Sequence, residues 1–376
     1  MTGQRILVVG AGFAGATYAR NLAEAGHSVT ILDKRDHIGG NAYDFVDQSG
    51  TRIHRYGPHL FHTNNEEVVH WLARWGDWVR YDHRVRALLP SGLTAPLPIN
   101  RRTLEIVFGV HLADAEAAQA LLARVSTEIE HPAHAADYLH SRIGKELTDL
   151  FFRPYTKKMW ALDLEELDAD VVKRLPLRFD DEDRYFPQDR FQLMPRHGYT
   201  AIFERILDHA NIKVELGQAF CRGMGRDYEA AFLSVPIDEY YSGCFGPLPY
   251  RSIRFEHATK VKQPEMSWAV TNFTDSGLWT RETAWHMLPH HDNGLASGTH
   301  TREEACDYTD NDFERYYPVR TSDGRFQKIY EQYAKLADET PQITFIGRCG
   351  LYQYLDMHQV INQSLLGVRR WLRRHG

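Results

Sequence analysis

Residues 5–33 read RILVVGAGFAGATYARNLAEAGHSVTILD and decide the fold of the N-terminal part of the chain. The apolar run at residues 6–9 is typical of a buried parallel strand, and a second run, residues 28–32, ends on Asp33. Between them lie three glycines in G-x-G-x-x-G spacing, Gly10, Gly12 and Gly15, followed by helix-forming residues. Such glycines permit a tight turn and a close approach of backbone to a pyrophosphate, and the acid after the second strand accepts from a ribose hydroxyl. The stretch therefore predicts a dinucleotide-binding Rossmann unit.

The residues after Asp33 decide between two candidate cofactors, NAD and FAD. The chain continues KRDHIGGN, residues 34–41, with paired glycines where a nicotinamide domain would enter its next helix. This extension resembles flavoproteins of the glutathione-reductase type, which bind an extended FAD. We therefore predict FAD, with Gly40 and Asn41 joining Asp33 and the three glycines as cofactor-binding residues.

Length, charge and cysteine usage limit the remaining possibilities. At 376 residues the chain exceeds the size at which one hydrophobic core stops growing, so two or three domains are expected. Its 44 basic and 50 acidic residues give a net charge of −6 without a long run of one sign, which gives no reason to expect nucleic acid or a membrane surface as a partner. The four cysteines have no metal-ligand spacing, and no signal peptide or long apolar segment is present. We expect a cytoplasmic protein.

The hydrophobic patterns further along the chain predict an α/β fold: an FAD-binding Rossmann-like domain with a helical insertion domain and an antiparallel β-sheet domain. Helical patterns dominate after residue 65, a charged and broken stretch reads as a mobile loop, and short alternating runs follow from about residue 250. The expected parts are an FAD-binding domain (1–75, 191–240 and 335–376), a helical substrate domain (76–165), a mobile loop (166–190) and an antiparallel sheet domain (241–334).

The C-terminal stretch FIGRCGLYQYLDMHQVI, residues 345–361, is interpreted as the return of the chain to the first domain. ITFIGR predicts a strand, and the residues from Leu355 onward predict a helix with Asp356 as a candidate N-cap. A helix N-terminus stabilises negative charge, so this helix would favour a reduced, anionic flavin.

Several segments together resemble UDP-galactopyranose mutases, and the resemblance spans nearly the whole chain. The segments are GAGFAGA, DKRDHIGGN, YGPHLFHTNN, RPYTKKMW, KRLPLRFDDEDRYF, MPRHGYT, TRE, YYPVR and GRCGLYQYLDM. The resemblance implies an isomerase that interconverts the pyranose and furanose forms of a nucleotide-bound galactose. It also implies that FAD is active in its reduced form, with flavin N5 attacking the anomeric carbon and displacing UDP.

The resemblance also implies roles for individual residues. Arg174 and Arg281 would contact the diphosphate, where a forked guanidinium binds two oxygens at once, and His62 would face flavin N5. Arg174 lies on the predicted loop and would arrive after substrate binds. The other predicted substrate-binding residues are Phe151, Phe152, Tyr155, Thr156, Trp160, Tyr185, Asn272, Tyr317 and Tyr354. The other predicted cofactor-binding residues are Arg348, Asp356 and Met357.

The sequence departs from the family pattern at six positions: Ala161, Val235, Trp279, Ala284, Cys349 and His358. Three of these, Trp279, Ala284 and His358, would surround the sugar by motif position, so the hexose can differ from galactose. A 6-deoxyhexose on UDP or another nucleotide is the alternative substrate. The expected partners are a UDP-hexose, a flavin reductant and a second copy of the chain in a homodimer.

The sequence also has to be compared with three other interpretations: an oxidase, a non-catalytic flavoprotein and a metal site. An FAD-dependent amine or alcohol oxidase would share the fold but would not need Arg174 or Arg281. A non-catalytic protein that keeps FAD for structure would bind flavin without turnover. A metal site at HMLPHHDNG, residues 286–294, is not predicted, because proximity in sequence does not make ligands converge and no H-E-x-x-H or Cys/His framework is present.

Overall fold

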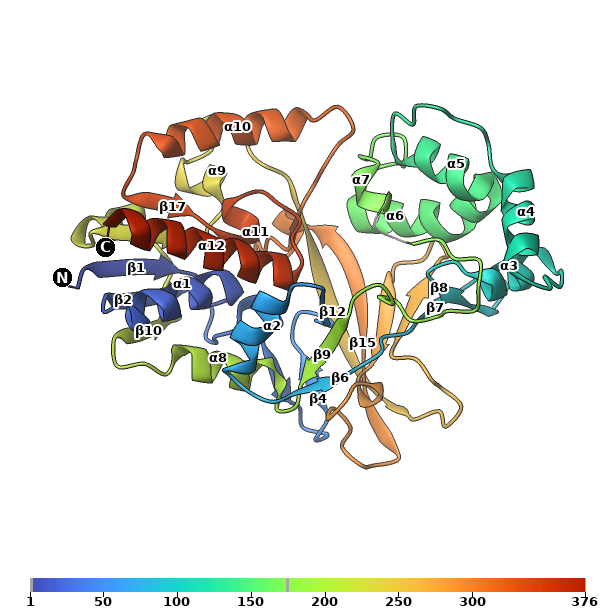
Figure 1. The fold of residues 1–376 in the computed structure, drawn as a ribbon, viewed down its shortest axis with the longest axis horizontal. Coiled ribbons are helices and arrows are strands. Elements are labelled where there is room, and N and C mark those ends of the chain that lie inside the picture. The colour runs from blue at the N-terminus through green and yellow to red at the C-terminus, as the bar shows by residue number, and fades with distance from the viewer. Residues whose placement is uncertain (1–2, 174–175, 376) are drawn as a thin grey trace.

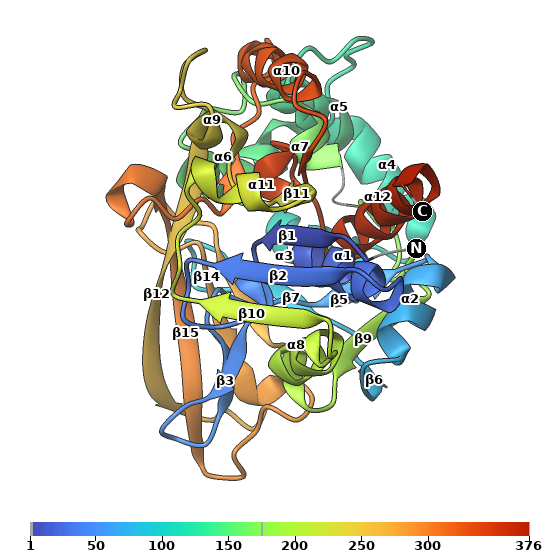
Figure 2. The ribbon, with the colours of Figure 1, turned by 90° about the vertical axis from the view of Figure 1, so that its left-hand side faces the viewer.

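The computed structural model describes residues 3–173 and 176–375. The N-terminal residues lie in a five-stranded parallel sheet with the order β10-β2-β1-β11-β17. The strands are β1 (Arg5–Val9), β2 (Ser28–Asp33), β10 (Ile212–Leu216), β11 (Ala230–Leu233) and β17 (Ile343–Phe345). Figure 2 shows β10, β2, β1 and β11 stacked in this order. The sheet unites three segments that lie far apart in the chain, as the Rossmann interpretation predicts.

Helices cover both faces of this sheet, which explains why its inner strands are continuously apolar. Along β1, Ile6 and Val8 pack with residues of α1 (Phe13–Glu24), α8 (Gly198–Leu207) and α12 (Met357–His375). The alternate residues Leu7 and Val9 pack with α9 (Ile237–Tyr240) and α10 (Arg325–Asp338). In Figure 1, α10 and α9 lie above β17 and α12 runs beside α1. The expected domain boundary at residue 335 falls inside α10.

A seven-stranded sheet, in the order β16-β12-β15-β14-β13-β7-β8, forms the middle of the molecule. Its strands are β7 (Val85–Leu88), β8 (Thr94–Leu97), β12 (Tyr250–Val261), β13 (Val270–Phe273), β14 (Arg281–Ala284), β15 (Ser297–Asp307) and β16 (Tyr317–Pro318). All neighbouring pairs are antiparallel except β13 with β7. In Figure 2, β12 and β15 run across the carboxyl ends of the parallel strands, the side on which ligands bind in open α/β sheets.

The structure corrects the expectation that residues 76–165 are mostly helical. Helix α2 (Glu66–Ala73) ends before Gly76, and residues 78–97 form β6 (Trp78–Arg80), β7 and β8. Residues in β7 alternate between buried and partly exposed, which is the period of a strand. The helical pattern was extended too far because a short alternating run between polar residues is a weak signal.

The helical lobe begins at Arg101 and has its own core, in which Leu121, Leu139 and Leu164 are buried. Its helices are α3 (Arg101–Phe108), α4 (Ala115–Val125), α5 (Ala135–Leu147), a π-helical turn (Thr148–Phe152), α6 (Arg153–Trp160) and α7 (Asp170–Lys173). Gly144, at φ +76°, kinks α5 where an added Cβ would meet the backbone of Val125. Helix α7 lies in the stretch expected to be only a loop; whether that stretch is mobile stays a prediction. Figure 1 shows this lobe on the right, above and beside β7 and β8.

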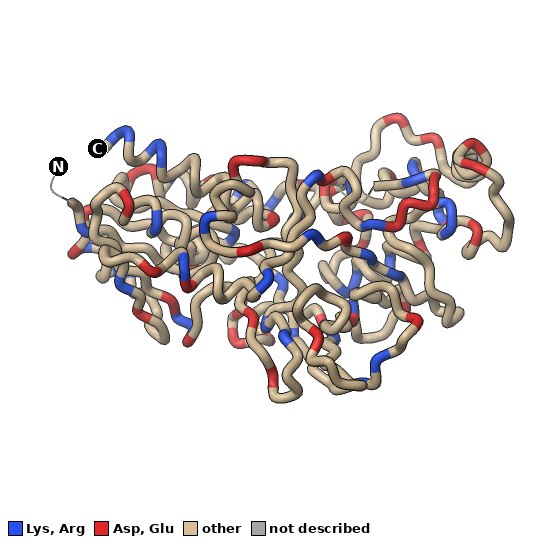
Figure 3. The backbone as a smooth tube through the Cα atoms, turned by 60° about the horizontal axis from the view of Figure 1, so that its bottom comes forward, with Lys and Arg blue, Asp and Glu red and all other residues tan. Residues whose placement is uncertain are grey.

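Smaller elements complete the fold. Strand β3 (Asp44–Val46) pairs with β4 (Arg52–His54), and β5 (Phe61–Thr63), β9 (Phe191–Pro195) and β6 form a three-stranded sheet in the order β5-β9-β6. The remaining elements are helix α11 (Gly347–Gly350) and 3-10 turns at Gly40–Ala42, Arg222–Asp227, Trp285–Met287 and Tyr308–Asp310. Acidic and basic residues are interspersed over most of the backbone in Figure 3. In the described part of the chain, no helix is long and apolar enough to cross a membrane.

Candidate active site

The candidate active site is a cavity of about 740 Å³ that the helical lobe, the seven-stranded sheet and the start of α12 enclose together. Most of the residues predicted from sequence line it. They are His62, Phe151, Phe152, Tyr155, Thr156, Trp160, Tyr185, Asn272, Arg281, Arg348, Tyr354, Asp356 and Met357. These residues come from segments up to 295 positions apart, so their convergence is a property of the tertiary fold. Arg174 lies outside the described residues.

Arg281 is held at the cavity by a buried carboxylate. It lies directly opposite Glu303 in the β14–β15 ladder, and its Nε donates to Glu303 Oε2 at 2.7 Å. Glu303 is fully buried, and its other oxygen, Oε1, has no hydrogen-bond partner among the described residues. Burial lowers the pKa of the Arg281 guanidinium, but the charge of Glu303 outweighs it and raises the pKa overall. Arg281 therefore carries a fixed positive charge beside the cavity. No sequence signal singled out Glu303.

Aromatic side chains form the wall next to Arg281. Burial raises the pKa of Tyr155 to about 12, so its phenol stays protonated and can donate a hydrogen bond at neutral pH. The ring of Trp160 packs against Tyr317 and Tyr354, with centroids at 4.9 and 5.9 Å. Arg348 lies 5.3 Å from the Tyr354 ring centroid and its Nε donates to the Leu355 carbonyl at 2.9 Å. The residues predicted to bind the nucleotide thus include a wall of packed aromatic rings.

The prediction that Tyr317 contacts the diphosphate is wrong for this structure. Tyr317 is buried in β16, does not line the cavity, and donates its hydroxyl to the Met159 carbonyl. Its neighbour Tyr316 lines the cavity instead, with its hydroxyl donating to the Tyr56 carbonyl. Because neighbouring residues of an extended chain point to opposite sides, the motif YYPVR alone does not say which tyrosine faces the ligand.

The residues predicted to hold the dinucleotide form a cradle at the carboxyl ends of β1 and β2. Gly10 has φ +100°, and Gly12 begins α1 without any side-chain cap. A Cβ on Gly40 would lie 2.9 Å from the Gly12 Cα, so the two glycines keep this approach open. Asp33 accepts from the Ala11 N–H at 2.7 Å, which fixes the carboxylate at the edge of the cradle. An uncapped helix N-terminus behind close-packed glycines fits the pyrophosphate of FAD.

The other two predicted cofactor residues of this region lie where the cradle continues. Gly15 packs against the Gly10 carbonyl so closely that an added Cβ would lie 1.9 Å from the oxygen. Asn41 accepts from Arg35 at 2.9 Å, and Arg35 also pairs with Glu314 at 2.7 Å. The backbone turn around Asn41 is thereby tied to the segment that precedes β16.

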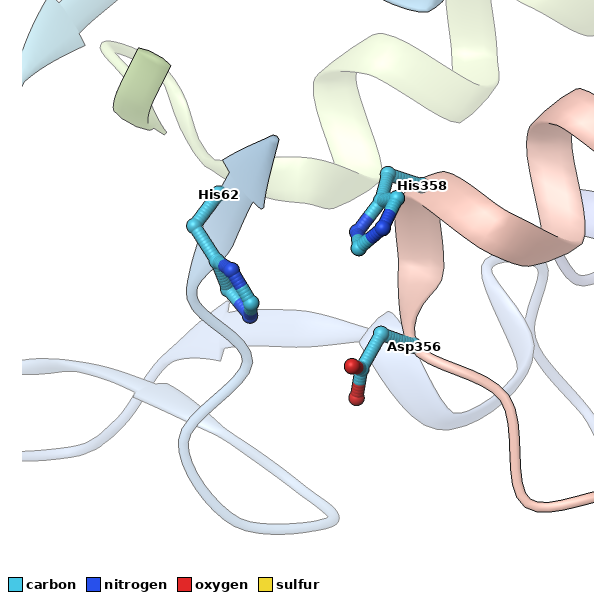
Figure 4. Close-up of side chains that lie close together, drawn as sticks. All are labelled: His62, Asp356 and His358. Atoms are coloured by element: carbon cyan, nitrogen blue, oxygen red, sulfur yellow. The ribbon is translucent and has the colours of Figure 1, made fainter. Parts of the chain in front are cut away.

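Three titratable side chains meet at the end of the cavity where α12 begins. His62 comes from β5, Asp356 lies directly before α12 and His358 lies in its first turn, as Figure 4 shows. One nitrogen or oxygen atom of each lies within 4.8 Å of the other two. The His62 Nδ1 lies 2.5 Å from Asp189 Oδ2. Sequence reasoning missed Asp189, because it was read as part of a loop.

The same three residues, of the part of the chain that the structure describes, are the one group with the geometry to hold a metal ion. None of them belongs to residues 286–294, the histidine-rich segment considered from sequence. They lie inside the cavity assigned to flavin and sugar, and the prediction that no metal takes part stays a prediction.

Two further histidines line the cavity that sequence reasoning did not assign. Burial lowers the pKa of His59 to about 4 and that of His83 to about 3, so both are neutral at physiological pH. His59 lies before strand β5, which begins at Phe61, and His62 lies within that strand, yet both reach the cavity.

The departures from the family pattern are not grouped around the cavity. Trp279 and Ala284 do not line it, and Ala284 is buried in the β14–β15 ladder opposite His300. Of the three residues expected to surround the sugar, only His358 lines the cavity. Trp279 and Ala284 therefore do not shape it directly.

Comparison of the sequence with known proteins identifies the family to which the chain is similar. The sequence profile of UDP-galactopyranose mutase matches residues 150–354, and that of an NAD(P)-binding Rossmann-like domain matches residues 8–75. The chain is 38% identical to a probable UDP-galactopyranose mutase of Klebsiella pneumoniae over 97% of this chain and 94% of that protein. It is 35% identical to the dTDP-fucopyranose mutase of Escherichia coli over 96% of both chains.

Solved structures agree on the fold. A crystal structure of reduced UDP-galactopyranose mutase superposes with a TM-score of 0.77 at 16% identity, covering 100% of this chain and 95% of the other. A putative protoporphyrinogen oxidase from Exiguobacterium has a TM-score of 0.69 at 14% identity, so oxidases share the architecture. An L-amino-acid oxidase of Mus musculus matches in sequence over only 19% of this chain.

The predicted fold class, the FAD cofactor and the assignment to isomerases are confirmed by these matches. A relative above 30% identity that is matched over almost its whole length sets this chain apart from the L-amino-acid oxidase, which matches over only 19% of this chain. The chain therefore belongs to the UDP-galactopyranose mutase family, whose members are flavin-dependent isomerases of the pyranose–furanose type.

Proposed function

We propose that the protein interconverts UDP-galactopyranose and UDP-galactofuranose in this cavity. The observation that carries the proposal is that one cavity is lined by the side chains assigned to the diphosphate and by those assigned to the flavin. Arg281 and Tyr155 stand for the first group, and His62 and Asp356 for the second. A reaction at the anomeric carbon needs both groups, because the bond that breaks joins the sugar to the diphosphate.

Arg281 is proposed to stabilise the leaving diphosphate. Since Glu303 holds its Nε, we assign the two terminal nitrogens of the guanidinium to the phosphate oxygens. Tyr155, Tyr185 and Tyr354 line the same wall and are proposed to donate to the diphosphate. Arg174 is proposed as the second cation on the strength of the family motif alone, because it lies outside the described residues.

Bound FAD, in its reduced form, would supply the nucleophile N5. The glycine cradle and Asp33 would hold its pyrophosphate and ribose, and Arg348, Met357 and the N-terminus of α12 would lie at its ring end. His62 and Asp356 would orient the sugar and the flavin edge. The aromatic wall would exclude water, which would otherwise compete for the activated anomeric carbon.

A 6-deoxyhexose carried by dTDP is the second candidate substrate. His358 lines the cavity at a position where the family motif usually has an acid, so one acceptor for a sugar hydroxyl is replaced by an imidazole. The similarity to a dTDP-fucopyranose mutase supports this candidate. A site that lacks a hydrogen-bond partner for one hydroxyl discriminates by about 10²-fold, whereas a site built around that hydroxyl rejects the deoxy analogue by about 10⁴-fold.

Chromatography of the nucleotide sugars after incubation with dithionite-reduced protein tests both candidates. We expect conversion of UDP-galactofuranose to UDP-galactopyranose by the reduced protein and none by oxidised protein under air. A kcat/KM for the dTDP-6-deoxyhexose above that for UDP-galactose would select the second candidate. The absence of ring interconversion for both substrates by reduced, FAD-loaded protein would contradict the proposal.

The physiological reductant, a homodimeric assembly and a cytoplasmic location stay predictions from the family resemblance and the sequence. Sedimentation of the FAD-loaded protein at several concentrations would test the dimer directly.

A further inference from the structure

Two residues of the stretch before β9, Phe186 and Asp189, contact the His62 imidazole on its face and at its edge. Phe186 stacks on the ring with centroids 3.6 Å apart and an interplanar angle of 8°. Asp189 meets the edge of the ring, with Oδ2 at 2.5 Å from Nδ1. A stacking partner restrains the tilt of an imidazole, and a hydrogen bond at one nitrogen restrains its rotation. The ring is therefore fixed in orientation within the cavity.

Asp189 is itself held in place. Its second oxygen, Oδ1, accepts from the Asn64 amide at 3.0 Å, and Asn64 accepts from the Arg190 N–H at 2.7 Å. These contacts join the residues on either side of the β5–β9 ladder, in which His62 pairs with Gln192. Asp189 also lines the cavity. The carboxylate is thus a fixed acceptor rather than a surface charge that happens to lie near a histidine.

We propose that Asp189 is a positioning residue that holds His62 in the tautomer with the proton on Nδ1 and Nε2 unprotonated. A carboxylate only accepts hydrogen bonds, so it selects the N–H at Nδ1 and leaves Nε2 as an acceptor for a group in the cavity. This inference rests on the proposed function for the identity of that group, a donor on the flavin or the sugar, but not for the tautomer itself.

The neighbours of His62 make such a selection necessary. Asp356 and His358 offer an acceptor and a second titratable ring within 4.8 Å of a His62 nitrogen. Without Asp189, the His62 proton could move to Nε2 and bond Asp356, which would turn the acceptor presented to the cavity into a donor. An asparagine at position 189 would produce this ambiguity with little change in volume, because its amide both donates and accepts.

The tautomer can be measured by NMR on FAD-loaded protein labelled with ¹⁵N-histidine, at about pH 8 so that ordinary histidines are neutral. The His62→Gln variant assigns the signal by its loss. We expect the Nδ1–H form in the unsubstituted protein and a mixture or the Nε2–H form in Asp189→Asn. An Nε2–H tautomer in the unsubstituted protein would overturn the proposal, whatever the variants do.

Kinetics of the reduced enzymes give the second readout. Asp189→Asn should lower kcat on the order of 10²-fold with a much smaller change in KM, as expected for a group that acts on the reacting centre. If Asp189 acts through His62, the double variant Asp189→Asn/His62→Gln should be no slower than His62→Gln alone. Additive losses, or full activity in Asp189→Asn, would overturn the proposal.

Asp181→Asn is the matched control. Asp181 lies in the same stretch, pairs with Arg101 at the surface, with its side chain 60% exposed, and does not line the cavity. It should leave both the tautomer and kcat unchanged. If the unsubstituted protein shows no ring interconversion with any nucleotide sugar, the proposed function fails, while the NMR measurement still decides the role of Asp189.

Discussion

Ala161 ends helix α6 in a left-handed conformation, with φ 57° and ψ 15°. The family pattern has glycine at this position, and the backbone explains why, because a Cβ in the left-handed region costs free energy that glycine does not. The departure at Ala161 is therefore a matter of backbone strain outside the cavity. It carries no information about the sugar.

Ala161→Gly should stabilise the protein by about 1 kcal/mol, since it relieves the left-handed alanine. Urea denaturation measures the change in the free energy of unfolding. Ala123→Gly, at an exposed position inside α4, is the control and should instead destabilise by about 1 kcal/mol. Equal effects of both substitutions would show that Ala161 is not strained.

Arg281→Ala should retain FAD but lose kcat/KM by about 10²-fold or more, because a charge-assisted phosphate contact in an enclosed site is removed. Affinity for UDP, measured by calorimetry, should fall as well. Arg302→Ala is the control: Arg302 pairs with Glu282 on the neighbouring strand and does not line the cavity. Near-normal turnover in Arg281→Ala would return this arginine to a structural role. The family motif predicts the same loss for Arg174→Ala.

At the scale of elements, the β14–β15 ladder places opposite charges across from each other on both of its faces. Arg281 lies opposite Glu303, and Glu282 lies opposite Arg302. Successive residues of a strand point to opposite faces, so one pair serves the cavity while the next pair lies on the other face. Glu282 also accepts from Lys260 at 2.7 Å and from His300 at 3.0 Å. The ladder is thus held by a network of residues that do not line the cavity.

This network should make the free energy of unfolding depend on pH in the acidic range. Burial raises the pKa of Glu282, but the hydrogen bonds from His300, Lys260 and Arg302 outweigh burial and lower the pKa to about 2. Because the folded pKa lies below the unfolded value, the contribution is present above about pH 4.5 and is lost as the pH falls toward 2. After allowance for solvent screening it amounts to about 1–2 kcal/mol.

Glu282→Gln should remove this contribution at pH 7 and flatten the dependence of unfolding free energy on pH between about 5 and 2. The measurement is urea denaturation at a series of pH values, with Glu128→Gln as an exposed control. An unchanged pH dependence in Glu282→Gln would contradict the assignment.

At the scale of the whole molecule, several histidines are buried in the interior. His54, His83 and His291 are almost fully buried, and His54 and His291 share a hydrogen bond at 3.0 Å. Burial lowers the pKa of His83 to about 3 and that of His291 to about 4, and it holds the pKa of His54 well below its usual range.

The lowered pKa values of these histidines determine how the stability of the protein changes with pH. The unfolded chain binds protons at these histidines below about pH 6.5 and the folded chain does not, so stability falls as the pH drops below 6.5. We expect a loss of several kcal/mol in the free energy of unfolding between about pH 7 and pH 4.5. His83→Gln should reduce the slope, and His111→Gln, at an exposed position, should not. A flat profile over this range would contradict the prediction.

The sequence alone was enough to predict those features of the fold that are formed by residues close together in the chain. The strand, glycine turn, helix and acid of residues 5–33 contact one another, so their order alone predicts the Rossmann unit and its cofactor cradle. The same holds for helix α12, whose apolar stripe is local, and for the motifs that indicate the family. Where a local signal was weak, as in residues 78–97, the expectation of helix failed because β7 pairs on one side with the nearby β8 and on the other with β13, which comes from a distant part of the chain.

Only the tertiary structure decided which side chains act together in the site. The choice of Tyr316 over Tyr317 depends on strand pairing, because a shift of one residue sends a side chain to the opposite face. The partners Asp189 of His62 and Glu303 of Arg281 were absent from the sequence reasoning, since neither motif contains its acceptor. The positions of Trp279 and Ala284 away from the cavity likewise depend on how the strands pack. The physical reason is that burial and hydrogen bonding are set by packing between segments distant in the chain, which no local pattern encodes.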